Sequence, residues 1–307
     1  RYIKKSSSVL CQGVAVRYAW MKKHKRLFPT AVMCRVLGTS TSGYYDSLKR
    51  HPCGQLVRRR SIAQAAAVSY FESNRIYGHR KVHEDLLAEG VICCRETVRR
   101  IMRNIGLYSR IKRKFVVTTD SNHALKIAEN ILDRDFTAKS ANQKWAADIT
   151  YIPTKLGWLY LAVVMDLFSR RIVGWAMSEN IDSALVQSAM KMALLHRDPD
   201  KGLIHHSDRG VQYAAEDFQD LLNDNKVVCS MSRKGNCWDN ACVESFFGNL
   251  KAEWVKEKIY ETFEDGQKDI FNYIEVFYNR KRRHASLGYV SPVVYEEMHE
   301  MKQGRAA

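Results

Sequence analysis

Apolar residues recur at helical spacing along the first third of the chain. Residues 31–37 predict a short helix, and residues 40–49 predict a second helix that Ser40 or Thr41 caps. Gly38-Thr39 lies between them and supplies a turn. Helix, glycine turn and helix is the order of a helix-turn-helix, a motif that places its second helix in the major groove of DNA.

A second helical unit is expected between residues 56 and 107. The spacing of apolar residues predicts helices at 56–71, 79–88 and 95–104, with a turn at Gly90 before the last of them. In that last helix Val98, Ile101 and Met102 are expected to face inward. Its outward side would then carry four cations that suit DNA phosphates, namely Arg95, Arg99, Arg100 and Arg103.

After residue 141 the pattern changes. Strands are expected at residues 144–153, 157–165, 171–177, 203–206 and 227–231. Helices are expected at residues 182–196, 214–223 and 239–256, the first of them capped by Asp182-Ser183. Three successive strands, followed by strands that alternate with helices, predict an α/β fold with a mixed five-stranded sheet.

These patterns divide the chain into four parts. We expect a basic helix-turn-helix-like segment at 1–52, a second helix-turn-helix-like DNA-binding domain at 53–108, a basic and polar linker at 109–140, and an α/β core with C-terminal helices at 141–300. The linker carries Arg110, Lys112, Arg113 and Lys114. It either follows a DNA backbone or is an ordinary solvated connection.

The charge of the chain is distributed unevenly. The 307 residues include 49 Lys and Arg against 33 Asp and Glu, a net charge of +16. Residues 1–120 hold 25 of the basic and 7 of the acidic residues, so the whole surplus lies in the first two-fifths. This asymmetry indicates a polyanion-binding arm attached to a nearly neutral core, with a merely solvated basic surface as the alternative.

The remaining composition excludes several classes of protein. Hydrophobic residues make up 46% and charged residues 27%, which is typical of a globular chain. No apolar run approaches 18 residues, and no signal peptide opens the sequence, so we expect neither a membrane nor a secreted protein. The eight cysteines form no CxxC pair and indicate reduced thiols in the cytoplasm. The chain opens on Arg rather than Met, as expected of a fragment or of the downstream part of a longer product.

Three carboxylates are candidates for chemistry. Asp148 lies in an apolar strand, where Asp is disfavoured, and Asp208 ends a strand, where sites form in open α/β sheets. Glu244 lies on the last predicted helix, with Asn240 and Lys251 near the same face. Together they could bind Mg²⁺ or Mn²⁺, which prefer oxygen ligands. Taken singly, each also fits an ordinary role as a strand-edge polar residue, a helix cap or a surface acid.

The spacing of these acids carries a resemblance. Sixty residues separate Asp148 from Asp208, 35 residues lie between Asp208 and Glu244, and a lysine follows Glu244 by seven. Further matching stretches are 33–38 with 42–45, 77–80, 142–151, 206–210, 231–251 and 278–284. Over residues 28–297 the chain resembles the OrfB part of bacterial insertion-sequence transposases, which are made by frameshifting between two overlapping frames. These are DDE transposases, related to the retroviral integrases.

The resemblance implies a ribonuclease-H-like catalytic core at 141–300, with Asp148, Asp208 and Glu244 as the metal-binding catalytic triad. Mg²⁺ would be the cofactor, with Mn²⁺ as a substitute. The implied reaction cuts insertion-element ends and joins the 3′-hydroxyl to a target phosphodiester by two-metal transesterification. Lys251 would contact DNA near the active site, and Asn240 would support Glu244 or the DNA.

The resemblance also implies partners: double-stranded DNA as element ends and target, an OrfA part or a fused OrfAB product, and further copies of the chain on DNA. The implied location is the cytoplasm, at the nucleoid. Residues 278–284 match a family motif whose basic cluster either touches DNA phosphates or is a solvated helix end.

Two other functions stay open. A ribonuclease-H-type nuclease fits the core, but cleavage alone does not require the long basic helix-turn-helix region. A DNA-binding regulator, inactive without an upstream OrfA part, fits the basic region, but the intact acids weigh against it. His79 and His83 with Cys93-Cys94 lack the CxxC pair of a zinc site. His205 and His206 are expected in a strand, one facing inward and one outward.

Overall fold

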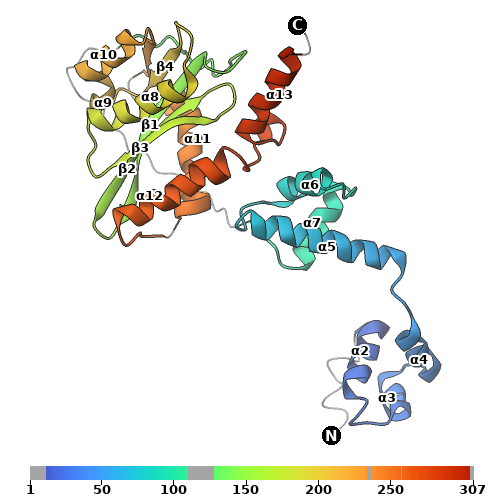
Figure 1. Cartoon of the computed structure of the whole chain (residues 1–307). Helices are drawn as coiled ribbons and strands as arrows, with labels where there is room; N and C mark the ends of the chain where they lie inside the picture. The colour runs from blue at the N-terminus through green and yellow to red at the C-terminus, as the bar shows by residue number, and fades with distance from the viewer. Residues whose placement is uncertain (1–11, 110–127, 234–236, 257, 305–307) are drawn as a thin grey trace. The chain divides into compact units, whose positions relative to one another are not determined.

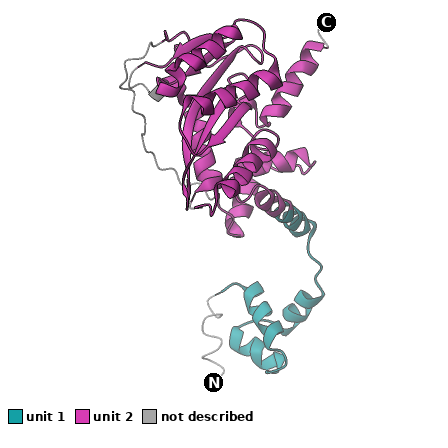
Figure 2. Ribbon diagram, turned by 60° about the vertical axis from the view of Figure 1, so that its left-hand side comes forward, with its two compact units in different colours: residues 1–64 teal, residues 65–307 magenta. Residues whose placement is uncertain are grey.

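The computed structural model describes residues 12–109, 128–233, 237–256 and 258–304. The chain divides into two compact units, residues 1–64 and residues 65–307 (Figure 2). Helix α5 (Gly54–Glu72) contains the point of division. The four-part division at 52/53, 108/109 and 140/141 stays a prediction.

From residue 12 onward, the helices of the first unit that precede α5 are α2 (Val14–His24), α3 (Thr30–Leu37) and α4 (Thr41–Lys49). α3 ends at Gly38, whose φ of 61° is the left-handed conformation that glycine adopts without strain. Ser40 caps α4, because its Oγ accepts a hydrogen bond from the backbone N–H of Gly43 at 3.2 Å. The two predicted helices and the turn between them are therefore confirmed, whereas α2 was not predicted. Their interpretation as a DNA-binding helix-turn-helix stays a prediction. The buried centre consists of Met21, Met33, Cys34, Leu37 and Tyr44.

The second unit begins with the end of α5, α6 (His79–Ala88) and α7 (Arg95–Asn104). The bounds of α6 and α7 are those expected from the apolar spacing. Val98, Ile101 and Met102 are buried, and the four arginines of α7 are exposed, as predicted.

The sheet of the second unit has five strands in the order β3-β2-β1-β4-β5. β1 (Lys144–Thr154), β2 (Gly157–Asp166) and β3 (Ile172–Ser178) form an antiparallel meander. β4 (Ile204–Ser207) pairs in parallel with β1, and β5 (Val228–Met231) pairs in parallel with β4. The mixed five-stranded sheet predicted from the sequence is confirmed.

Helices α8 (Ser183–Arg197), α9 (Val211–Ala214) and α10 (Glu216–Asp224) pack on the sheet (Figure 1). Their apolar side chains form one core with β1, β2 and β3, in which Trp145, Met190 and Leu222 are fully buried. Asp182 caps α8 as expected, accepting a hydrogen bond from the N–H of Leu185. The helix expected at 214–223 is present as α10, but its expected start at Ala214 was wrong, because extended backbone at Ala215 separates α9 from α10.

The continuous helix expected at 239–256 was also wrong in detail. A 3-10 turn η1 (Cys237–Asn240) leads into α11 (Ala241–Leu250), and a π-helical turn η2 (Lys251–Val255) follows. The helical path ends at Lys256, which has a φ of 37°. Beyond it lie α12 (Phe263–Phe271), a π-helical turn η3 (Asn272–Tyr278), a 3-10 turn η4 (Ala285–Leu287) and α13 (Pro292–Gly304).

Part of the expected linker belongs to the core. The backbone N–H groups of Ile131 and Leu132 donate to Oγ of Ser230 on β5, and Leu132 is 1% exposed. The basic run Arg110 to Lys114 lies outside the described residues. Within the described ranges, no helix combines the length and the apolar character needed to cross a bilayer.

Candidate active site

Asp148 lies on β1, and Asp208 directly follows β4, the strand that pairs with β1 in parallel. β1 and β4 pair in parallel with Ala146 opposite His206, and β4 ends at Ser207. Carried two residues further, this register puts Asp208 beside Asp148, in strands that are typically about 4.8 Å apart. The parallel pair thus places residues that are sixty apart in sequence beside each other, and the two acids have this spacing.

A hydrogen bond ties the helix that carries Glu244 to the same strand. Asn240 is 4% exposed, and its Nδ2 donates to the carbonyl oxygen of Ala147 at 3.0 Å. Ala147 immediately precedes Asp148, so the start of α11 lies against the site. Glu244 follows Asn240 by four residues, about one helical turn, and its side chain is partly buried. Two strands and one helix thus bring the three predicted acids into one region.

The acids influence one another electrostatically. Burial raises the pKa of Asp148 well above its ordinary value, and the negative charges of Asp208 and Glu244 raise it further. The backbone N–H of Ile149, which donates to Asp148 at 2.8 Å, and the ammonium of Lys251 act in the opposite direction. Burial followed by the charge of Asp208 also raises the pKa of Glu244. Negative charges that lie close together in a partly buried site are stabilised by a bound cation.

Lys251 lies beside this group. Its Nζ is 4.3 Å from the centroid of the Tyr151 ring on β1, within the range of a cation–π contact. Burial lowers the pKa of Lys251, while the charge of Asp148 raises it. The predicted neighbourhood of Lys251 and the acids is therefore present, although Lys251 belongs to the π-helical turn η2 and not to a continuous α-helix.

The donor set fits a hard divalent cation. Carboxylate oxygens are the ligands that Mg²⁺ prefers, and the buried Oδ1 of Asn240 adds an amide oxygen with no hydrogen-bond partner among the described residues. In the ranges that the structure describes, no group of three or more His, Cys, Asp or Glu is close enough to enclose a metal ion. Mg²⁺ usually takes one or two protein carboxylates and completes its shell with water and substrate phosphates.

The two histidines before Asp208 differ from expectation. Both are fully buried, so the prediction of one inward and one outward ring was wrong. The reason for His205 is that its ring packs against Tyr213 of α9 and Phe218 of α10, which cover the sheet there. His206 makes hydrogen bonds with the hydroxyls of Ser230 and Ser232, at 2.9 and 3.1 Å. Burial lowers the pKa of His206 to about 4, so it is a neutral structural group.

Sequence reasoning missed a neighbouring acid, Asp239. Its side chain is fully buried and forms ion pairs with Arg134 at 2.9 Å and Arg233 at 3.1 Å. Although burial alone would raise the pKa of Asp239, the hydrogen bonds from Arg233 and Arg134 bring it well below the ordinary value. Asp239 directly precedes Asn240, so these ion pairs fix the beginning of the helix that carries Glu244. No local signal marks the pair with Arg134, because Arg134 is 105 residues away.

The arginines of α7 form ion pairs of their own. Arg99 and Arg100 contact Glu96 at 2.7 and 3.1 Å, and hydrogen bonds from these arginines lower the pKa of Glu96 to about 2. These pairs are exposed, so each contributes little to stability and leaves the cations accessible to a stronger anion.

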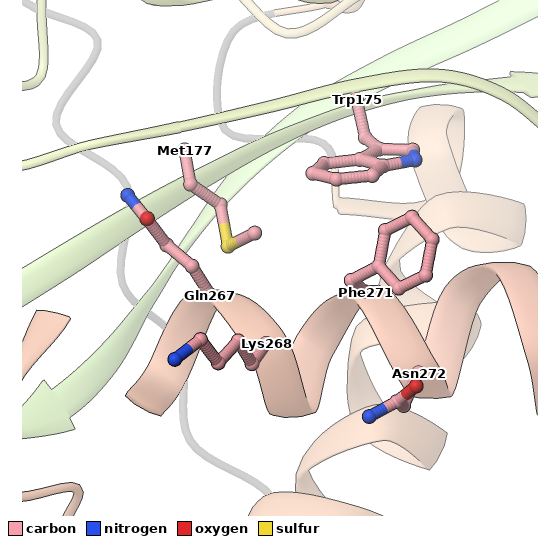
Figure 3. Close-up of a pocket in the computed structure, with 6 residues that line it drawn as sticks. All are labelled: Trp175, Met177, Gln267, Lys268, Phe271 and Asn272. Carbon is pink, nitrogen blue, oxygen red and sulfur yellow. The ribbon is translucent and has the colours of Figure 1, made fainter. Parts of the chain in front are cut away.

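A hollow of about 540 Å³ lies apart from the acids (Figure 3). It lies between β3 and α12, where the rings of Trp175 and Phe271 are 6.0 Å apart. Its lining contains no acid, so it does not share the chemistry of the site at β1 and β4. The lining residues are Trp175, Met177, Gln267, Lys268, Phe271 and Asn272.

Comparisons with known proteins match both halves of the chain. A family model described as an integrase core domain matches residues 138–237, and a second integrase core domain model matches residues 225–292. A model of an HTH-like domain matches residues 58–115. The expected core and the expected second helix-turn-helix region therefore both have relatives.

Full-length relatives are also found. A transposase InsF for insertion sequence IS3A of Escherichia coli (strain K12) is 40% identical over 285 residues, covering 92% of this chain and 98% of that protein. An uncharacterized 31 kDa protein of insertion element IS600 from Shigella sonnei is 40% identical over 270 residues, covering 88% of this chain and 99% of that protein. Among solved structures, the HTLV-2 integrase catalytic core domain in complex with magnesium is 17% identical, with a TM-score of 0.40 over 52% of this chain and 98% of that chain.

Proposed function

Because the chain belongs to the IS3 family of insertion-sequence transposases, we propose that it cuts the ends of an insertion element and joins the freed 3′-hydroxyl to a target phosphodiester. The observation that carries this proposal is the grouping of Asp148, Asp208 and Glu244 where β4 ends beside β1. A ribonuclease-H-type nuclease would need this site alone. Membership of the transposase family and the basic helices favour the joining reaction.

Asp148, Asp208 and Glu244 would bind two divalent cations, Mg²⁺ in the first place and Mn²⁺ as a substitute. Such ions activate an attacking hydroxyl and stabilise the departing oxygen of a phosphodiester. The role of the three carboxylates is to hold the cations where the scissile phosphate arrives, at the open end of β4. Burial and the charges of neighbouring acids raise the pKa of Asp148 and of Glu244, so a bound cation would stabilise their charged forms.

Lys251 would hold a phosphate of the bound DNA strand near the acids. Its ammonium has the sign required, and it lies close enough to Asp148 for the charge of that acid to raise the pKa of Lys251. Asn240 would act through position: its amide is buried and bonded to Ala147, so it sets where α11 begins and where Glu244 lies. A direct contact between Asn240 and DNA would require this amide to leave its buried position.

The helices of residues 54–104 would bind the element ends. Arg95, Arg99, Arg100 and Arg103 lie exposed on α7, which follows a turn at Gly90 and has a buried apolar side. Such a helix fits the major groove, with its cations against phosphates. We further propose that the protein works in the cytoplasm at the nucleoid, as several copies on DNA, and with an OrfA part or as a fused OrfAB product.

One experiment tests this function. The purified chain is incubated with Mg²⁺, labelled duplexes made from the DNA that flanks its coding sequence, and a target plasmid. Labelled ends covalently joined to the plasmid are expected, and a chelator should abolish them. Cleavage without joining would indicate a nuclease instead. Binding without cleavage, restored to joining when an upstream OrfA part is added or fused, would indicate a chain that acts alone only as a DNA-binding regulator.

A further inference from the structure

The segment Tyr278–His284 contains four successive cations, Arg280 to Arg283, which in sequence resemble a DNA-binding patch. In the structure two of them are engaged by the protein. The side chain of Arg282 is 7% exposed and forms an ion pair at 2.6 Å with Glu253, whose side chain is fully buried. Arg283 contacts α6, as described below. The segment therefore does not present all four cations to DNA phosphates.

One end of the segment is attached to the sheet. The side chain of Asn279 accepts a hydrogen bond from the N–H of Ile172 at 3.0 Å and donates one to its carbonyl oxygen at 2.9 Å. Ile172 is the first residue of β3, the edge strand of the sheet. The hydroxyl of Tyr278 also donates to the carbonyl oxygen of Arg170, at 3.1 Å. These bonds make the beginning of the segment part of the catalytic core.

The other end of the segment contacts the helix-turn-helix-like region. The hydroxyl of Tyr77, which lies just before α6, donates to the carbonyl oxygen of Lys281 at 3.1 Å and accepts from the N–H of Arg283 at 2.9 Å. The guanidinium of Arg283 donates to Asp85 of α6 at 2.5 Å. Asp85 in turn accepts a hydrogen bond from Ser69 of α5 at 2.6 Å. The segment is therefore bonded to the helices that precede α7.

This contact is packed as well as hydrogen-bonded. Tyr77 is 4% exposed, and the ring of His284 packs edge-on against Tyr278 with centroids 4.9 Å apart. Nζ of Lys81 on α6 lies 5.0 Å from the centroid of the Tyr77 ring, and burial followed by the charge of Arg282 lowers the pKa of Lys81 to about 8. Charge-assisted hydrogen bonds in partly buried surroundings are stronger than exposed ones, so the contact resists rotation of α6 against the core.

We infer that residues 278–284 form a clasp that sets the distance between the DNA-binding helix α7 and the acids at β1 and β4, and so selects which phosphodiester is cut. This inference rests on the proposed function. Successive nucleotides of one strand are about 3.4 Å apart along the duplex, so a small shift of α7 against the core moves the cut by one position. Tyr77, Asp85 and Arg283 are positioning residues in this scheme, because they touch neither the acids nor the DNA phosphate at the site.

The test maps cut positions on labelled flanking-DNA duplexes at single-nucleotide resolution, using the full chain in Mg²⁺. Arg283→Ala removes the contact to Asp85, Arg283→Lys keeps its charge, and Tyr77→Phe removes two hydrogen bonds while keeping the ring. Arg280→Ala is the matched control, because Arg280 is an exposed cation of the same segment. DNA affinity and the melting temperature are measured for each variant.

We expect Arg283→Ala and Tyr77→Phe to spread cleavage over several neighbouring phosphodiesters and to lower the share of cuts at the wild-type position at least threefold. Arg283→Lys should recover part of this precision, and Arg280→Ala should cut as the wild type does. DNA affinity should stay within about threefold throughout.

Wild-type precision in folded Arg283→Ala and Tyr77→Phe would overturn the inference while leaving the transposase function intact. An equal spread in Arg280→Ala would also overturn it, since precision would then depend on charge alone. If Arg283→Ala does not fold, the milder Tyr77→Phe and Arg283→Lys decide by the same criterion. Absence of cuts by the wild-type chain, with or without an OrfA part, would instead contradict the proposed function.

Discussion

Two groups of buried or partly buried acids occur in the second unit, and they differ in their partners. Asp239, Glu253 and Glu296 each form ion pairs with arginine: Glu253 with Arg282 at 2.6 Å, and Glu296 with Arg197 at 2.8 Å. The second group consists of Asp148, Asp208 and Glu244. There the charges of neighbouring acids raise the pKa of Asp148 and of Glu244, while the ammonium of Lys251 acts to lower the pKa of Asp148. The first group is electrostatically complete within the chain, whereas the second gains from an added cation.

The difference separates structural acids from acids that serve chemistry. Burial alone would raise the pKa of Glu296, but hydrogen bonds from Arg197, Ser169 and Arg171 bring the pKa below its ordinary value. For Asp148 the balance is reversed, and burial and neighbouring acids dominate. A folded chain has little reason to gather like charges for stability, so their grouping indicates a functional site. Removal of an acid should therefore have opposite consequences in the two groups.

The largest effect is expected from neutral substitutions in the second group. Asp148→Asn, Asp208→Asn and Glu244→Gln should each lower strand transfer by on the order of 1,000-fold or more, because the metal stabilises the reacting phosphate by several kcal/mol. The melting temperature should stay the same or rise, since a repulsive charge is removed. Strand transfer by any one of these variants at near wild-type rate would show that its acid is not a ligand.

A stability effect of about 3–5 kcal/mol is expected from the first group. Glu253→Gln leaves the buried guanidinium of Arg282 without its counter-charge, and breaking a buried pair from one side costs about this much. Urea unfolding measures the change. The matched control is Glu261→Gln, which breaks the exposed pair with Lys155 and should cost less than about 1 kcal/mol. Equal losses in both variants would mean that burial does not decide the value of these pairs.

Lys251 is a cation that lies beside the second group of acids. Lys251→Ala should lower joining of pre-cut ends about 100-fold, because misplacing a reacting group by about 1 Å can cost this factor. The fold should be retained. Lys201→Ala is the control, because Lys201 is exposed and precedes β4, at the opposite end of the strand from Asp208. Equal activity of the two variants would reduce Lys251 to a packing role beside Tyr151.

The smallest effect is expected on α7, far along the chain from the acids. Arg103→Ala should weaken DNA binding less than about tenfold in moderate salt, because one phosphate contact is lost among several. The slope of log affinity against log salt should fall in magnitude by about 0.9. A filter-binding or anisotropy titration across salt concentrations measures this slope. An unchanged slope would place Arg103 outside the DNA interface.

Local signals accounted for most of the elements. The bounds of α6 and α7 and the cap at Ser40 follow from apolar spacing and capping residues within one or two turns. Caps and periodicity depend on near neighbours in sequence, and this is why they could be predicted.

Features that depend on distant partners could not be predicted. The expected helix at 239–256 becomes a π-helical turn at η2, where Glu253 meets Arg282, 29 residues further along. In the sequence, Arg283 belongs to a basic cluster that suits DNA phosphates. In the structure it contacts Asp85, which is 198 residues away. His206 can be buried because the hydroxyls of Ser230 and Ser232 form hydrogen bonds with the two nitrogens of its ring. In each case the partner is distant in sequence, so the residues next to each position do not predict the contact.

Calorimetric titration of Mg²⁺ into the chain bound to a pre-cut DNA end tests the contrast between the two groups of acids most directly. Heat from the same DNA without protein is subtracted. We predict that the wild type and Glu296→Gln bind Mg²⁺ alike, whereas Asp148→Asn and Asp208→Asn bind it at least tenfold more weakly. Equal Mg²⁺ binding by the wild type, Asp148→Asn and Asp208→Asn would contradict the assignment of these acids as the metal-binding site.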